Sequence, residues 1–222
     1  MAILSGPSLE PVSKKIEKIV ILFHGYGASG DDLLSLADEW QKDMPDTLFL
    51  LPHAPTMMTQ NGGYQWFDLP DVSYQTLLNN IGPILPILQN YIDQVIEKYQ
   101  VSEQDIALVG FSQGSMIAIA TALIRTHSLA AVLSYSGAFV LPESYDINKD
   151  VPVLLIHGDF DQVVPIMYQD MSQKALVMRG VSVNTYICKN IGHGINQEGI
   201  QVGQDFLCQN LGVSQHKNNL NT

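Results

Sequence analysis

Short apolar runs alternate with segments of helical periodicity from about residue 18 to residue 211. Most of these runs are hydrophobic at consecutive positions, as expected for parallel strands that are covered on both faces. The alternation therefore predicts a single α/β domain with a mostly parallel central sheet and helices on both faces. The expected strands are 18–23, 47–51, 105–111, 129–136, 151–157 and 181–187. The expected helices are 31–43, 74–99, 113–126, 165–180 and 195–211.

The two ends of the chain lie outside this pattern. Residues 1–17 are expected to form an N-terminal extension or an edge strand, and glycine and proline interrupt them before a signal-type apolar stretch develops. Residues 212–222 are expected to form a polar tail that frays. Within the domain, Pro83 and Pro86 should kink or split the helix at 74–99.

Composition excludes several classes of function. The chain has a net charge of -11, and no cluster of basic residues is longer than Lys14-Lys15. A nucleic-acid partner is therefore not expected, and charge alone would not bind the chain to anionic lipids. No run reaches the length of a membrane span, so no integral membrane segment is expected. Cys188 and Cys208 are too few for a disulfide framework; we interpret them as buried free thiols of a cytoplasmic protein, with a single disulfide as the alternative.

A serine stands where an apolar strand pattern changes into an apolar helix pattern. In the segment 107–124, ALVGFSQGSMIAIATALI, Ser112 has Gly110 and Gly114 two residues away on each side. A sharp strand-to-helix turn crowds its neighbours, and glycines relieve that crowding so that the serine projects as a nucleophile elbow. The alternative is a tight turn in which Ser112 only caps the helix. The setting of strand, turn and helix favours the nucleophile.

A serine hydroxyl needs a base, and in folds with such an elbow the chain order is serine, then acid, then histidine. His193 satisfies this order, and Gly192 and Gly194 on either side allow its loop to approach other backbone closely. The other histidines lie outside the order, before the candidate acids or in the polar tail: His24, His53, His127, His157 and His216.

Two carboxylates in the segment HGDFDQVVP compete for the role of the acid that orients His193. Asp159 follows the expected strand closely and suits a turn in which its side chain bonds its own backbone. Asp161 lies further into the loop and can reach across to His193, so we predict Asp161 as the acid.

Two backbone N–H groups are candidates for an oxyanion hole. The N–H of Gln113 lies at the positive end of the helix that follows Ser112. The glycine-rich segment FHGYG at 23–27 would supply the N–H of Tyr26 as the second donor. The alternative is a glycine-rich turn without a catalytic role.

Six blocks of sequence resemble a known family. They occur in the order found in the phospholipase/carboxylesterase family, which includes acyl-protein thioesterases and lysophospholipase-like esterases: FHGYGASGDDL, LPHAP, GYQWFDLP, GFSQGSM, HGDFDQVVP and GHGI. The resemblance extends from about residue 18 to residue 209. It implies an α/β-hydrolase fold with Ser112 as nucleophile, Asp161 as acid and His193 as base. It also implies Tyr26 and Gln113 as oxyanion donors.

The chain departs from the family pattern at two places. Gly27 is followed by Ala28, where many relatives have an aspartate, and Ser115 stands where a third glycine is common. The first departure could reshape the entrance for the acyl group.

The predicted function is a serine carboxylesterase that hydrolyses carboxylic esters, and thioesters as well, through an acyl-enzyme, without a metal or a cofactor. Its substrate could be a small ester, a lysolipid or an acylated protein. The alternatives are a lysophospholipase or acyl-protein thioesterase in vivo, a lyase on the same scaffold, and a hydrolase-shaped binding protein. Exposed apolar loops would be compatible with a homodimer.

The connection between the strands ending near Ser136 and starting near Val151 is too short for a helical lid domain. An open site is therefore expected. The segment 56–67 is its predicted wall, with Met57, Met58 and Trp66 as substrate-binding residues. For Trp66 the alternative is a side chain that fills the core.

Overall fold

A computed structural model describes residues 4–59, 62–71 and 73–214 of the chain. In this part the main sheet has seven strands in the order β1-β3-β2-β6-β7-β8-β9. All neighbours pair in parallel except β1, which pairs antiparallel with β3 at one edge. The strands are β1 (Ser8–Leu9), β2 (Lys18–Phe23), β3 (Thr47–Leu50), β6 (Ile106–Phe111), β7 (Ala131–Tyr135), β8 (Val153–Gly158) and β9 (Val183–Cys188).

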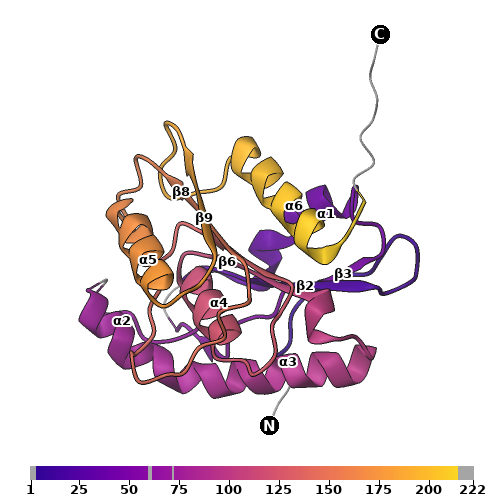
Figure 1. Cartoon of the computed structure of the whole chain (residues 1–222), viewed down its shortest axis with the longest axis horizontal. Helices are drawn as coiled ribbons and strands as arrows, with labels where there is room; N and C mark the ends of the chain where they lie inside the picture. Colours follow the sequence, from indigo (N-terminus) through magenta and orange to yellow (C-terminus); the bar gives the residue numbers. More distant parts are fainter. Residues whose placement is uncertain (1–3, 60–61, 72, 215–222) are drawn as a thin grey trace.

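Helices cover both faces of this sheet (Figure 1). One face packs against α1 (Leu34–Gln41) and α6 (Gln197–Leu211). The other packs against α2 (Tyr74–Ile81), α3 (Leu85–Tyr99), α4 (Gln113–Leu123) and α5 (Met167–Met178). Short 3-10 turns precede α1, α3 and β6 at Gly30–Leu33, Gly82–Ile84 and Glu103–Asp105. This arrangement is the predicted α/β-hydrolase fold.

The two-sided cover explains the consecutive hydrophobic residues of the central strands. Along β2, Ile19, Ile21 and Phe23 enter the core beneath α3 and α4, while Val20 and Leu22 enter the core beneath α1 and α6. Both layers therefore need apolar side chains, and a strand without polar positions results.

Several expectations about the elements are confirmed. The expected helix at 74–99 is split at Pro83, since a 3-10 turn at Gly82–Ile84 separates α2 from α3. The N-terminal segment contains the short edge strand β1. Cys188 and Cys208 are both buried free thiols. The frayed tail was predicted for residues that, from 215 onward, lie outside the described residues.

The connection between β7 and β8 contains turns and bends but no helix, so no lid domain is present there. A small separate hairpin, β4 (Thr56–Met57) with β5 (Tyr64–Gln65), lies in the segment predicted as the wall of the site. Among the described residues, no helix has the length and apolar character needed to cross a membrane.

Candidate active site

Ser112 lies at the turn from β6 into α4, with φ 54° and ψ -118°. A positive φ is strained for a serine, and such strain persists only where neighbouring structure enforces it. The glycines two residues away enforce it by close packing. A Cβ atom on Gly110 would lie 2.3 Å from the carbonyl oxygen of Gly114, and one on Gly114 would lie 2.0 Å from that of Phe23. The predicted strand-turn-helix setting of the serine is confirmed.

The imidazole of His193 lies between Ser112 and Asp161. Its Nε2 is 3.0 Å from the Oγ of Ser112, and its Nδ1 is 2.8 Å from the Oδ2 of Asp161. The ring of Phe111, the last residue of β6, packs at a tilt against the imidazole with 4.9 Å between centroids. This contact was not predicted from the sequence. The loop between β9 and α6 thus places His193 in contact with Ser112 and Asp161, which are far from it in the sequence.

The carboxylate of Asp161 is fully buried, while 17% of the His193 side chain is exposed. The Oδ1 of Asp161 accepts hydrogen bonds from the backbone N–H groups of Val163 and Val164, each at 2.9 Å. Burial alone would raise the pKa of Asp161. The hydrogen bonds from His193 and from the backbone outweigh burial and hold this pKa below its usual value. An ionised acceptor therefore faces the imidazole.

Asp159, the competing candidate, contacts the beginning of the loop between β9 and α6. Its Oδ1 accepts a hydrogen bond of 2.7 Å from the backbone N–H of Asn190, and Lys189 lies 3.7 Å from its Oδ2. The expectation that Asp159 bonds its own backbone is wrong, because the carboxylate braces the chain just after β9. It supports the loop that leads to His193.

The glycine-rich loop at 24–27 lies directly beside Ser112. A Cβ atom on Gly25 would be 3.4 Å from the Cβ of Ser112, and Tyr26 is the next residue. Gln113 is the first residue of α4, so its N–H has no carbonyl of the preceding helical turn to bond. The two predicted donor groups thus belong to two separate segments that both adjoin Ser112.

The side chain of Gln113 forms a buried clamp on the segment that follows β5. Its Oε1 accepts from the backbone N–H of Trp66 at 2.9 Å, and its Nε2 donates to the carbonyl of Phe67 at 2.8 Å. Tyr64 in turn bonds the loop beside Ser112, because Gly27 N–H donates to its carbonyl at 2.9 Å. A backbone role was predicted for Gln113, and the role of its side chain was missed.

Trp66 is not part of a wall. Its side chain is buried, its indole N–H donates to the carbonyl of His24 at 2.9 Å, and the ring meets Phe23 edge to face. The substrate-binding prediction for Trp66 is therefore wrong, and the alternative, that it fills the core, holds. Met57 is 61% exposed on β4, and the Sδ of Met58 would lie 3.9 Å from a Cβ atom on Gly27. For these two methionines the substrate contact stays a prediction.

The side chain of His24 supports the glycine-rich loop at 24–27. Its Nε2 accepts from the backbone N–H of Ala54 at 3.0 Å, so Nδ1 carries the proton and donates to the carbonyl of Gly25 at 2.8 Å. Burial lowers the pKa of His24, which favours this neutral form. From the sequence, His24 was predicted only as part of a glycine-rich turn.

Comparison with known proteins identifies the family. The sequence pattern of the Phospholipase/Carboxylesterase family matches residues 5–211. The chain belongs to the phospholipase/carboxylesterase family. It is accordingly an ester-bond hydrolase of the serine hydrolase class, and the resemblance found in its six blocks is confirmed.

Relatives of this phospholipase/carboxylesterase include both thioesterases and esterases by name. Acyl-protein thioesterase 1 of Neurospora crassa is 27% identical over 224 residues, covering 92% of this chain and 91% of its own. Esterase YpfH of Escherichia coli is 24% identical over 195 residues, covering 87% and 83%. Among solved structures, esterase PE8 is 36% identical with a TM-score of 0.89, covering 94% of this chain and 99% of its own.

The structure explains one departure from the family pattern. Ser115, at the position where a third glycine is common, places its hydroxyl in hydrogen-bond contact with that of Ser134 on β7. Gly137 makes room for it, since a Cβ atom there would lie 2.4 Å from the Cβ of Ser115. The extra side chain is accommodated beneath the elbow rather than in the site.

Gln113→Met should lower the free energy of unfolding by about 2–4 kcal/mol, because two buried backbone groups lose their partners while side-chain volume is retained. Urea denaturation measures this loss. The matched control is Gln65→Met, which removes only the surface hydrogen bond to Asp68 and should stay within about 0.5 kcal/mol of the parent. Equal losses in the two variants would contradict the clamp.

Proposed function

We propose that this hydrolase is a carboxylesterase that cleaves carboxylic esters and thioesters by way of an acyl-enzyme on Ser112. The observation that carries the proposal is the hydrogen-bonded chain from Ser112 Oγ through His193 to the buried Asp161. An imidazole in this position can accept the hydroxyl proton as the oxygen attacks, and a buried carboxylate fixes the tautomer that leaves Nε2 free.

In the first step, the Oγ of Ser112 bonds to the substrate carbonyl carbon while its proton passes to Nε2 of His193. The carbonyl π electrons move to the oxygen, which becomes an oxyanion. When the carbonyl re-forms, the bond to the alcohol or thiol breaks, and His193 returns the proton to that leaving group. A water molecule then repeats the sequence on the acyl-enzyme, with His193 as base, and releases the carboxylic acid.

The oxyanion would be stabilised by the N–H groups of Tyr26 and Gln113. These groups come from two segments that the clamp of Gln113 ties together through Trp66, Phe67 and Tyr64. Because the donors are held in place before the reaction, little reorganisation is needed as charge develops. One such donor contributes about 3 kcal/mol to transition-state stabilisation in serine hydrolases.

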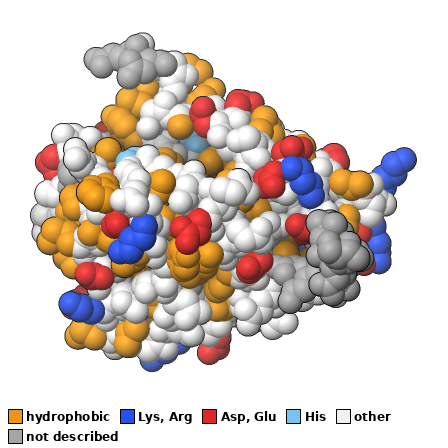
Figure 2. Space-filling model, turned by 90° about the horizontal axis from the view of Figure 1, so that it is seen from above, with side chains coloured by type: hydrophobic (Ala, Val, Ile, Leu, Met, Phe, Trp, Pro, Cys, Tyr) orange, Lys and Arg blue, Asp and Glu red, His pale blue; other side chains and the backbone are white. Residues whose placement is uncertain are grey.

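The surroundings suit a substrate bound mainly through its acyl part. Figure 2 shows one face of the molecule, on which hydrophobic and uncharged atoms cover wide areas between scattered charged side chains. The short connection 136–152 has no helix to close over the site. Met57 and Met58 would supply adaptable apolar contact, and a bulky leaving group could remain outside. An acyl-protein thioesterase is the second candidate, favoured by the similarity to the Neurospora crassa protein of that name.

A fluorophosphonate probe tests the proposal without any substitution. We expect one covalent adduct per chain, on the peptide that contains Ser112, with loss of p-nitrophenyl ester hydrolysis in proportion to labelling. Heat-unfolded protein should not react, since an isolated serine hydroxyl is a weak nucleophile. Full activity in protein without an adduct at Ser112, or labelling elsewhere that alone removes activity, would refute the proposal. A chain-length series of esters, thioesters, acylated peptides and lysophosphatidylcholine then defines the substrate.

A further inference from the structure

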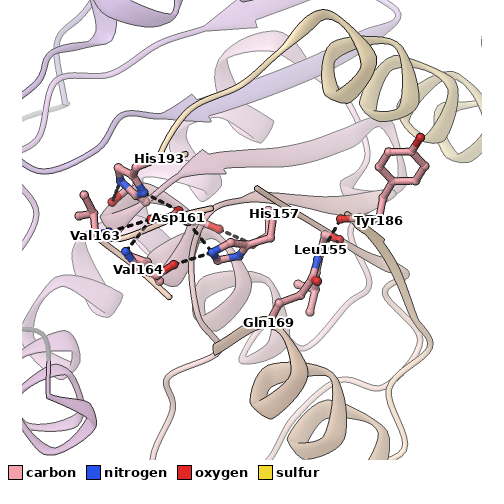
Figure 3. A network of polar contacts seen from close by, with 11 residues as sticks. Leu155, His157, Asp161, Val163, Val164, Gln169, Tyr186 and His193 are labelled. Atoms are coloured by element: carbon pink, nitrogen blue, oxygen red, sulfur yellow. Dashed lines mark hydrogen bonds and ion pairs between the residues drawn. The ribbon is translucent and has the colours of Figure 1, made fainter. Parts of the chain in front are cut away.

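A second histidine approaches Asp161 from the side opposite His193 (Figure 3). His157, in β8, places its Nε2 2.7 Å from the carbonyl oxygen of Val164 and 3.4 Å from the Oδ2 of Asp161. Its side chain is 2% exposed, so solvent does not compete for these contacts. His157 was excluded as the catalytic base because it precedes the candidate acids in the chain.

The contacts define the protonation of this imidazole. A carbonyl oxygen only accepts, so the Nε2 of His157 must carry a hydrogen and donate it to Val164. Burial lowers the pKa of His157, although Val164 and Asp161 act in the opposite direction. The ring is therefore held as a neutral donor with its Nε2–H directed at Val164 and, at longer range, at Asp161.

These contacts close a ring around the carboxylate. Val164 accepts from His157 through its carbonyl and donates to the Oδ1 of Asp161 through its N–H. Oδ2 faces both imidazoles, with His193 at 2.8 Å and His157 at 3.4 Å. Each carboxylate oxygen thus has two donors near it, and rotation of the carboxylate would break contacts on both sides.

The backbone that completes the ring is anchored further along. Gln169, in the first turn of α5, donates to the carbonyls of Leu155 and Tyr186 at 2.8 and 3.0 Å. The first turn of α5, which follows the segment after Asp161, is therefore bonded to both β8 and β9. His157 connects to the middle of this segment.

We infer that His157 is a positioning residue, which holds Asp161 in the orientation that His193 requires and does so without touching the substrate. This inference rests on the proposed function of Ser112, His193 and Asp161. His157 contacts Asp161 in two ways. It bonds the Val164 peptide, whose N–H donates to Oδ1, and it lies directly beside Oδ2.

Two amides of different reach test the inference. In His157→Gln the Nε2 of the amide lies near the position of the imidazole Nε2 and can donate to Val164, whereas the shorter amide of His157→Asn cannot reach it. We expect His157→Asn to lower kcat for p-nitrophenyl ester hydrolysis about ten- to a hundred-fold with KM changed less than about threefold. His157→Gln should restore most of kcat. Equal kcat in the two variants would overturn the inference.

A double-mutant cycle separates positioning from general damage. If His157 acts through Asp161, then in an Asp161→Asn background His157→Asn should lower the single-turnover acylation rate less than about twofold. The same fold loss in both backgrounds would show a structural effect and overturn the inference. If His157→Asn does not fold, His157→Met takes its place in both comparisons. A Ser112→Ala control that stays active would refute the proposed function itself, whereas an inactive one with unaffected His157 variants would refute only the positioning role.

Discussion

Ser112→Ala is expected to lower kcat/KM for p-nitrophenyl ester hydrolysis by about 10⁵-fold or more. Without Oγ no acyl-enzyme forms, and His193 loses the hydroxyl that it faces at 3.0 Å. The residual rate would come from water attack on an ester held beside the backbone N–H groups, which gives a small acceleration over solution. The fold should persist, because the substitution removes only one hydroxyl oxygen from a largely buried side chain and leaves no large cavity.

Ser136 offers a matched control for this substitution. It directly follows β7, has a positive φ of 49°, and its buried Oγ has no hydrogen-bond partner within the described residues. Ser136→Ala therefore deletes the same hydroxyl from a similarly strained backbone, and kcat/KM should change less than about threefold. Comparable losses in both variants, measured at matched protein stability, would mean that the elbow hydroxyl is not the nucleophile.

The residues of the hydrogen-bonded chain could be predicted because their signals are local and ordered. Gly-Phe-Ser-Gln-Gly follows an apolar run and precedes another, and that short context is enough to predict the elbow at Ser112. Asp161 and His193 follow from the order of strand ends in a parallel sheet, since their loops must meet at the same edge. The apolar strands were predictable for a related reason, because burial on both faces removes the polar positions.

The supporting contacts could not be predicted, because they join side chains and backbone from segments with no common pattern. Gln113 clamps Trp66 and Phe67 more than forty residues earlier in the chain, and nothing in either segment specifies the direction of that side chain. From the sequence, His157 is only one more residue of an apolar strand. Its contact with the carbonyl of Val164 becomes evident only in the structure. Trp66 was misassigned for the same reason: an aromatic residue in a loop gives no indication of which way it points.

Gly114→Ala is expected to destabilise the protein by about 3 kcal/mol or more. Its Cβ would lie 2.0 Å from the carbonyl oxygen of Phe23 and 2.5 Å from that of His24. Both obstacles are backbone atoms at the end of β2, so no side-chain rotation can relieve the overlap. Helix α4 would have to move away from the sheet.

Urea denaturation followed by the fluorescence of Trp40 and Trp66, both buried, measures the change. Gly82→Ala is the matched control, because its φ is -54° and a Cβ atom there would meet nothing within 4 Å. That variant should gain about 0.4–1 kcal/mol by restricting the unfolded chain. If Gly114→Ala were as stable as the parent, α4 could not be pressed against β2 as described. A displaced α4 would carry Ser112 and Gln113 away from the loop that contains Tyr26, so the esterase activity of any folded Gly114→Ala protein should fall as well.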